Sequence, residues 1–402
     1  MLALSGAAIP VTSAGADAPA GEKPKFTGDP ITVVTIGEFA VAAVGSENPE
    51  LAGAVKARAK AINKAGGLED ASGETHKLRV VACNTDLDPN KAEQCARDAV
   101  DEGAVAVLGQ NSVNGAQIFP ALEEAGIPSI GNIVFQPVDA SSPVAFPLTP
   151  GIPGIFAGLP QVLAEDGATE ISYIVSDIGA TTAAAVLFLD QGTELAGAQK
   201  GPEVLVPPDA TDLAPYVATG TAEPVDGAVA FLLGEIESTL IRQIAESGFD
   251  GPVSTQAGLL TESILDDAGD AADGLLVVGP VVPFTNTKVK GIKMFRKDMA
   301  AYDDSLALND SAVNSWLATY VFEQVAGTLP TIDSGSVREA MGQLVDFDTL
   351  GITPPLDTTE LSGLPLLDRV FNPTVVFSAV EDGKIVQSDR RFFNPFTGEF
   401  EG

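Results

Sequence analysis

The sequence predicts an α/β protein built from two doubly wound parallel sheets. Short runs of β-branched residues alternate with segments of helical periodicity, at the spacing of right-handed βαβ units. The alternation stops at a stretch interrupted by prolines, between Pro137 and Pro153, and then resumes. A length of 402 residues suits two domains of roughly 100 to 200 residues each.

The elements of the first series have clear boundaries. Asp88 and Pro89 place an N-cap next to a first-turn proline, while Gly66-Gly67 and Gly103 are typical of helix ends. The expected strands are 31–36, 78–83, 105–108 and 129–133, and the expected helices are 49–65, 89–102 and 115–125.

The second series begins with a helix over 155–165. It continues with strands at 171–176, 203–206, 227–233 and 274–278 and helices at 181–195 and 236–247. A proline-bearing segment, 279–284, precedes two further helices over 289–302 and 312–328. The chain then becomes irregular, and an Asp382-Gly383 turn between 374–380 and 384–386 predicts a hairpin.

These interruptions predict the domain boundaries. We expect a flexible leader over 1–30, a first lobe from 31–147 plus 280–350, and a second lobe from 148–279 plus 351–402. The leader is rich in Ala, Gly, Pro and Ser and lacks a basic start, although Ala18, Pro19 and Ala20 suit a cleavage site. It is either the remainder of a trimmed export signal or a tether that holds the fold away from a membrane surface.

Composition argues against several classes of partner. With 22 Lys and Arg against 55 Asp and Glu, the formal net charge is −33. Nucleic-acid binding requires clustered cations, and anionic lipid would repel such a chain. No apolar stretch approaches the roughly 20 residues of a membrane helix.

Few residues are suited to catalysis or metal binding. The single histidine, His76, lies in a polar stretch that predicts a solvated turn, so neither a triad nor a multi-histidine metal site is expected. Cys83 and Cys95 have neither the number for a four-Cys zinc site nor the Cys-x-x-Cys spacing of redox enzymes. We expect a disulfide between them, which would place the protein outside the cytoplasm, with two buried free thiols as the alternative.

Nucleotide-binding motifs are also incomplete. The segment 109–115 has the glycine spacing of a phosphate loop, but Ala116-Gln117 stand where Lys and Ser or Thr would grip phosphate and magnesium. The sequence therefore predicts no cofactor. The lone tryptophan, Trp316, lies on an apolar helix face and is expected in the core.

A binding site is expected where strands end and helices begin, because open parallel sheets bind ligands there. The candidate side chains in these loops are the apolar Phe39, Ile133, Phe135, Ile178 and Phe284 and the polar Asn111, Ser112, Asn132, Glu235 and Gln256. Two alternatives remain open, since Ser112 or Asn114 could cap the next helix and Glu235 could be an exposed first-turn residue. The loops contain no Arg, Lys or His, which favours a small neutral, zwitterionic or cationic ligand with an apolar portion.

Several segments in order resemble a known family, the type I periplasmic solute-binding proteins of ABC importers, in the leucine/isoleucine/valine-binding group. The likeness extends over roughly 31–386 and is carried by 61–67, Asp88-Pro89 with Ala92 and Ala96, 105–109, 122–128, 240–243 with Gly248, and 268–274.

The resemblance implies two lobes joined by three crossings of the chain. The lobes would trap a ligand between them by hinge closure and would not transform it chemically. Ser112 matches the family's serine that meets the amino-acid head group. The family's threonine falls near Phe135, its tyrosine near Thr181 and its ammonium-binding acid near Gln256 or Ala257, so Glu235 is the remaining carboxylate. An exported monomeric receptor that serves an ABC importer permease is therefore expected, with a ligand-sensing regulatory domain or an enzyme on the same scaffold as alternatives.

Overall fold

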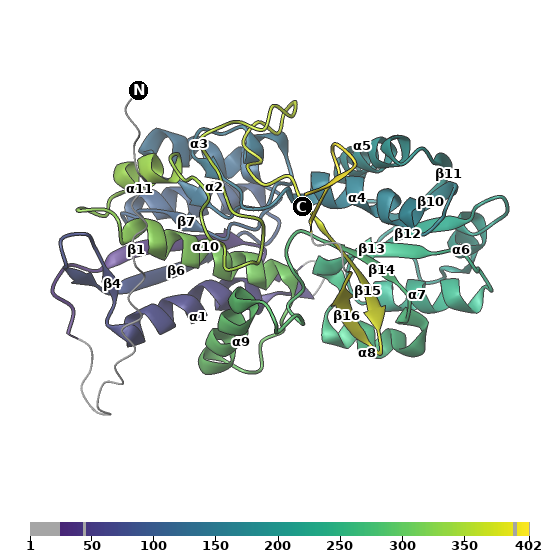
Figure 1. Ribbon diagram of the computed structural model, residues 1–402, viewed down its shortest axis with the longest axis horizontal. Coiled ribbons are helices and arrows are strands. Elements are labelled where there is room, and N and C mark those ends of the chain that lie inside the picture. Colours follow the sequence, from purple (N-terminus) through teal and green to yellow (C-terminus); the bar gives the residue numbers. More distant parts are fainter. Residues whose placement is uncertain (1–24, 43–45, 389–391, 402) are drawn as a thin grey trace, which may run out of the picture.

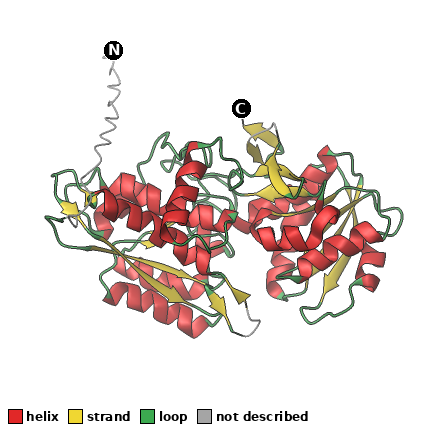
Figure 2. Cartoon of the chain, turned by 90° about the horizontal axis from the view of Figure 1, so that it is seen from below, coloured by secondary structure: helices red, strands yellow, loops and turns green. Residues whose placement is uncertain are grey.

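The computed structural model describes residues 25–42, 46–388 and 392–401. Two lobes lie side by side, each with a central sheet covered by helices on both faces (Figures 1 and 2). The predicted α/β class with two doubly wound sheets is confirmed. Most of the expected leader, residues 1–24, lies outside the described residues.

The first lobe contains a five-stranded parallel sheet in the order β6-β1-β7-β8-β9. Its strands are β1 (Ile31–Gly37), β6 (Leu78–Asn84), β7 (Val107–Leu108), β8 (Ser129–Ile130) and β9 (Ala145–Phe146). Six helices accompany it: α1 (Pro49–Ala65), α2 (Pro89–Asp101), α3 (Gly115–Ala125), α9 (Lys290–Tyr302), α10 (Asp310–Ala326) and α11 (Ser334–Met341). Helices α2 and α3 pack on one face, and α1 and α10 on the other.

The second lobe contains a seven-stranded sheet in the order β11-β10-β12-β13-β14-β15-β16. The parallel strands are β10 (Glu170–Ser176), β11 (Gln199–Val206), β12 (Gly227–Phe231), β13 (Val253–Gln256) and β14 (Leu276–Gly279). The predicted hairpin extends this sheet as antiparallel β15 (Val376–Glu381) and β16 (Lys384–Gln387). Its helices are α4 (Gly151–Glu165), α5 (Ala180–Leu195), α6 (Ala214–Gly220), α7 (Ile236–Glu246) and α8 (Glu262–Ala268).

Short elements complete the fold. They are the strand pairs β2 (Ala40–Val41) with β3 (Ser46–Glu47), β4 (Leu68–Glu69) with β5 (Thr75–His76), and β17 (Phe392–Asn394) with β18 (Glu399–Glu401), and the 3-10 turns η1 (Pro137–Ala140), η2 (Ala257–Leu259) and η3 (Gly269–Ala272). Among the described residues, no helix is both long enough and apolar enough to cross a membrane.

The chain crosses between the lobes three times. It passes from β9 to α4, from β14 to α9, and from α11 to β15. At the first crossing Gly151 has a φ of +59°, and a Cβ there would lie 2.6 Å from the carbonyl oxygen of Val134. Only glycine fits this close approach. Helix α4 begins at this residue, four residues before the predicted start at 155. Pro153 is tolerated in that first turn because the N–H groups there have no partner within the helix.

The C-terminal connection differs from the expected lobe boundary. Residues 351–372, assigned to the second lobe by sequence, pack largely against the first. Ile352 belongs to the same buried cluster as α9 and α10, and its carbonyl accepts from Val282 N–H at 2.9 Å. Arg369 donates through Nε to the carbonyl of Ala145 (2.7 Å). Apolar contacts with α9 and β9 decide this placement, and a segment without periodicity gives no sign of them.

Cys83 and Cys95 form the predicted disulfide, which links the end of β6 to helix α2. Thiol titration of the denatured, unreduced protein should find no free thiol. Because the closed loop is short, replacing both cysteines with serine should lower the free energy of unfolding by about 3 kcal/mol. Two titratable thiols per chain would contradict this prediction.

Trp316 is fully buried in α10, as predicted. His76, in contrast, is not a solvated turn residue. It belongs to β5 and is 8% exposed, because residues 26–29 lie over it and Asp29 accepts from its ring.

Candidate ligand-binding site

A pocket of about 150 Å³ lies where the two lobes face each other. It is bounded by the carboxyl ends of β10, β12 and β13, by helices α4 and α5, and by two residues of the first lobe. The lining residues are Val113, Phe135, Ile152, Phe156, Val175, Ser176, Ile178, Thr181, Thr182, Ala185, Val186, Leu189, Phe231, Leu233 and Gln256. This lining is mostly apolar and carries no charge, and a cavity of this size holds a group as large as benzene.

The floor of the pocket is aromatic and fixed. Phe156 on α4 meets Phe231 on β12 edge to face, with ring centroids 4.9 Å apart, and both rings are buried. Such a pair contributes about 0.5–1.5 kcal/mol beyond the area it buries. The floor is therefore formed before any ligand arrives.

The turn from β10 to α5 is held by its own side chains. Thr182 Oγ1 accepts from the amide of Ile178 (2.8 Å) and donates to the carbonyl of Ser176 (2.6 Å). The Ser176 hydroxyl accepts from the amide of Leu233 (3.1 Å), which joins this turn to the one after β12. These bonds give the loops at the rim a defined shape.

A buried carboxyl supports the second-lobe wall from behind. Glu237 on α7 is fully buried and accepts from the amide of Leu232 (2.6 Å) and from Thr255 Oγ1 (2.7 Å). Burial raises the pKa of Glu237 to about 7, and these two hydrogen bonds oppose that shift. Glu237 therefore positions the residues beside Leu233 and Gln256.

The first lobe has its own buried acid, Glu38, directly after β1. One oxygen accepts from Ser112 Oγ and from Thr85 Oγ1, both at 2.8 Å. Burial raises the pKa of this carboxyl, and the two hydroxyl donors partly oppose the shift. The Ser112 hydroxyl also accepts weakly from the amide of Asn114 (3.2 Å) in the turn before α3, while the N-cap residue Asn114 makes no side-chain capping bond, so the capping alternative is not what the structure shows.

A second carboxyl, Asp139, holds the turn that carries Phe135. Its Oδ2 accepts from the amides of Phe135 (2.9 Å) and Gln136 (2.7 Å). Burial raises its pKa to about 7, with a contribution from the charge of Glu38. The two acids therefore lie near each other beneath the first-lobe wall, where neither is compensated by a described salt bridge.

Three of the predicted site residues line the pocket together, namely Phe135, Ile178 and Gln256. Phe39, Asn111 and Ser112 gather at the ends of β1 and β7, where Asn111 bridges Gly37. Glu235 is exposed just before α7, the alternative considered from sequence.

The structure places three other predicted residues away from this pocket. Asn132 is fully buried and donates to the Asp139 carbonyl (2.7 Å), and Ile133 is 9% exposed. Phe284 is 1% exposed in the core with α9, because the crossing that carries it is covered by that helix. An apolar residue after a strand looks the same in sequence whether it faces a cleft or a core.

The sequence did not predict the three buried acids that support the site, which are Glu38, Asp139 and Glu237. Glu38 lies in a loop that the sequence did indicate, directly after a strand, and that position was the available signal. Nothing local marks the other two as buried, because their partners come from other turns or strands.

Two lobes with three crossings and an uncharged pocket between them define a two-lobed binding protein. A family model described as periplasmic binding protein matches residues 39–361. The chain belongs to the periplasmic binding protein family, and the predicted resemblance is confirmed. A search of curated proteins found no match.

Solved structures show the same fold at low identity. A substrate-binding periplasmic protein from Ralstonia solanacearum is 18% identical, with a TM-score of 0.73 and coverage of 89% of this chain and 100% of the other. An ABC transporter substrate-binding protein from Aeropyrum pernix is 15% identical, with a TM-score of 0.75 and coverage of 92% and 98%. The branched-chain amino acid transporter substrate-binding protein LivJ from Streptococcus pneumoniae, in complex with isoleucine, is 15% identical, with a TM-score of 0.69 and coverage of 89% and 100%.

Proposed function

We propose that this protein is an extracytoplasmic receptor that traps a small organic ligand between its lobes and delivers it to an ABC importer. The observation that carries the proposal is the uncharged pocket to which both lobes contribute, with Val113 and Phe135 on one side and the ends of β10, β12 and β13 on the other. Hinge closure around a ligand would bury it against both walls. The Cys83–Cys95 disulfide agrees with a location outside the cytoplasm.

The ligand we propose has an apolar portion and no strong net negative charge, as an amino acid or a related compound would have. Its apolar part would enter the pocket above Phe156 and Phe231, which has room for a benzene-sized group. The described pocket lining also offers no cation to pair with an anion. The isoleucine bound by the Streptococcus pneumoniae relative is one compound of this kind.

The same geometry favours binding without chemistry. The described pocket lining offers hydroxyls and one amide, from Ser176, Thr181, Thr182 and Gln256, but no acid, base or thiol. Recovery of the ligand unchanged after incubation would support this role, and turnover of a screened compound would contradict it.

A thermal-shift screen followed by calorimetry tests the proposal. The screen covers isoleucine and other amino acids, aromatic acids, polyols and small amides, and a ligand at a hundred times its dissociation constant stabilises the fold by about 2.7 kcal/mol. For the ligand found, Ile178→Asp should weaken binding at least tenfold, because closure would desolvate the new carboxylate.

Leu187→Asp is the matched control. Ile178 and Leu187 are both exposed apolar residues of the second lobe, at 38% and 68%, but only Ile178 lines the pocket. The control should change the affinity less than twofold. Equal affinities in the two variants would remove this pocket from the binding site.

A further inference from the structure

We propose that Asp70, Glu74 and His76 form a binding site for a divalent transition-metal ion, with zinc as the type ion. The three residues lie in the hairpin of β4 and β5, at the end of the first lobe that points away from the second (Figure 1). The site is remote from the ligand pocket and does not depend on the proposed function.

The spacing of the ligand atoms suits one ion. One donor atom from each residue lies within 4.8 Å of the other two, and His76 Nε2 is 3.5 Å from Asp70 Oδ2. Two ligands of a tetrahedral zinc ion, each about 2.0–2.1 Å from the metal, are about 3.3 Å apart. Only a small approach of the Glu74 side chain is then needed, and Glu74 is exposed and free to make it.

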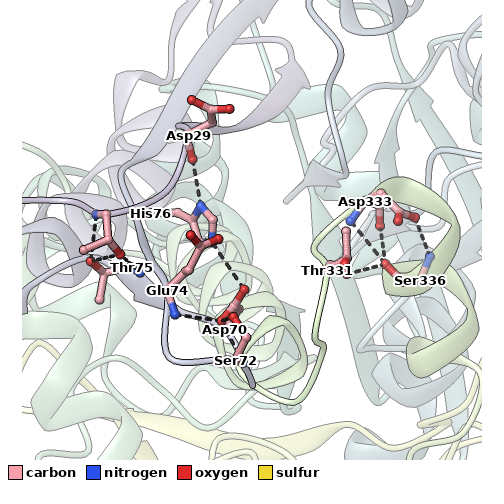
Figure 3. A network of polar contacts seen from close by, with 10 residues as sticks. Asp29, Asp70, Ser72, Glu74, Thr75, His76, Thr331, Asp333 and Ser336 are labelled. Atoms are coloured by element: carbon pink, nitrogen blue, oxygen red, sulfur yellow. Dashed lines mark hydrogen bonds and ion pairs between the residues drawn. The ribbon is translucent and has the colours of Figure 1, made fainter.

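The histidine is oriented for ligation. Figure 3 shows its ring between Asp29 and Asp70, with Glu74 beside it. Nδ1 is 2.8 Å from the backbone carbonyl of Asp29, which can only accept, so Nδ1 carries the hydrogen and Nε2 is the nitrogen that would offer its lone pair to a metal ion. Metal-binding histidines typically donate their second nitrogen in this way.

The His76 ring is also held in place by packing, and its buried Nε2 makes no hydrogen bond of normal length. His76 is 8% exposed, and a Cβ on Gly28 would lie 2.2 Å from its Cε1, so the segment over it packs tightly. Nε2 is buried and lies 3.5 Å from Asp70 Oδ2, which is long for a hydrogen bond, and it has no other partner among the described residues. A buried nitrogen that faces two carboxylates without a hydrogen bond of normal length is a position where a cation would satisfy all three groups.

The two carboxylate oxygens of Asp70 have different roles. Its Oδ1 accepts from the amide of Ser72 (2.8 Å), the hydroxyl of Ser72 (2.7 Å) and the amide of Glu74 (2.9 Å). These bonds shape the turn and leave Oδ2 directed at the histidine. The carboxylate is therefore held in place before an ion arrives.

The donor set decides the class of ion. One imidazole with two carboxylates suits zinc and similar first-row ions, whereas calcium and magnesium prefer oxygen ligands alone. Three protein ligands leave a fourth tetrahedral position for water. The ion would fasten the hairpin to the segment at Asp29, where the chain enters the fold.

A proton on Nε2 is the competing occupant, since it would give an ordinary pair between His76 and Asp70. Calorimetry with zinc chloride on the tag-free, EDTA-treated full chain distinguishes the two. We expect one saturable site in 0.15 M salt, lost or weakened at least tenfold in His76→Gln and in Glu74→Gln. Glu69→Gln is the control, because Glu69 is an exposed acid of the same hairpin outside the cluster, and it should bind as the wild type does.

Cobalt(II) provides a second readout that needs no variant of the buried histidine. Bound cobalt should give the visible absorption of a tetrahedral site, displaced by one equivalent of zinc and absent in Glu74→Gln. The proposal is overturned by the lack of a saturable site in the wild type, or by equal zinc affinity in Glu74→Gln and Glu69→Gln. The second outcome would assign the binding to the general acidity of the chain.

Discussion

Replacing Arg58 with methionine is expected to lower the free energy of unfolding by about 3–5 kcal/mol, because it leaves two largely buried carboxylates without their cation. Arg58 on α1 pairs with Asp298 on α9 (3.2 Å) and with Glu323 on α10 (2.5 Å), and its side chain is 12% exposed. The guanidinium also lies 5.4 Å from the ring centre of Trp316, whose Nε1 donates to Asp298 (2.9 Å). One residue therefore joins three helices of the first lobe.

Urea unfolding followed by tryptophan fluorescence measures this loss. The chain has a single tryptophan, so the signal reports on the first lobe. Arg79→Met is the control, since Arg79 pairs with Glu102 at 2.6 Å but both side chains are well exposed, at 48% and 38%. An exposed pair contributes about 0–1 kcal/mol. Comparable losses in the two variants would show that burial of the Arg58 network does not govern its contribution.

Much of the architecture could be predicted because parallel strands buried on both faces are continuous apolar runs. Strand β1 (Ile31–Gly37) and helix α2, which begins at Pro89 after the Asp88 cap, lie within a residue or two of their expected bounds. These signals are local, since they depend on residues adjacent in the chain.

The predictions that were wrong share a physical cause. The residues concerned are buried by segments that lie far from them in the sequence. His76 resembles a turn residue until the segment at Asp29 covers it, and Ile352 has no periodicity to show that α9 will pack on it. Glu38 would be solvated if Ser112 and Thr85, 74 and 47 residues away, did not enclose it. The polar part of the candidate site depended on such contacts, whereas Phe135, Ile178 and Gln256 could be found by position after a strand.

The second large effect concerns pH. Asp310, the first residue of α10, is fully buried at the boundary between the lobes, where a Cβ on Gly279 would lie 2.6 Å from its Oδ2. Burial raises the pKa of Asp310 to about 8 from an ordinary 3.8, although a hydrogen bond from the backbone of Phe284 opposes the shift. Between these two values the folded state holds a proton that the unfolded state has lost.

Stability from this group is therefore fully present below about pH 4 and is lost as the pH rises through 8. For one proton, each pH unit in that window lowers the free energy of unfolding by about 1.4 kcal/mol, which amounts to about 3–4 kcal/mol between pH 5 and 8. Self-repulsion in a chain of net charge −33 acts in the same direction. The difference between two variants is thus more informative than the slope of the wild type alone.

Asp310→Asn should remove this one proton from the pH dependence, because the amide stays neutral throughout. Urea titrations from pH 5 to 8 should show a slope flatter than that of the wild type by about 1.4 kcal/mol per pH unit. Asp304→Asn makes the same change of charge at an exposed position, in the loop between α9 and α10, and should leave the slope unaltered. If the two variants had parallel curves, Asp310 would be ionised in the folded protein, and its buried charge would require a cation or a donor from another part of the chain.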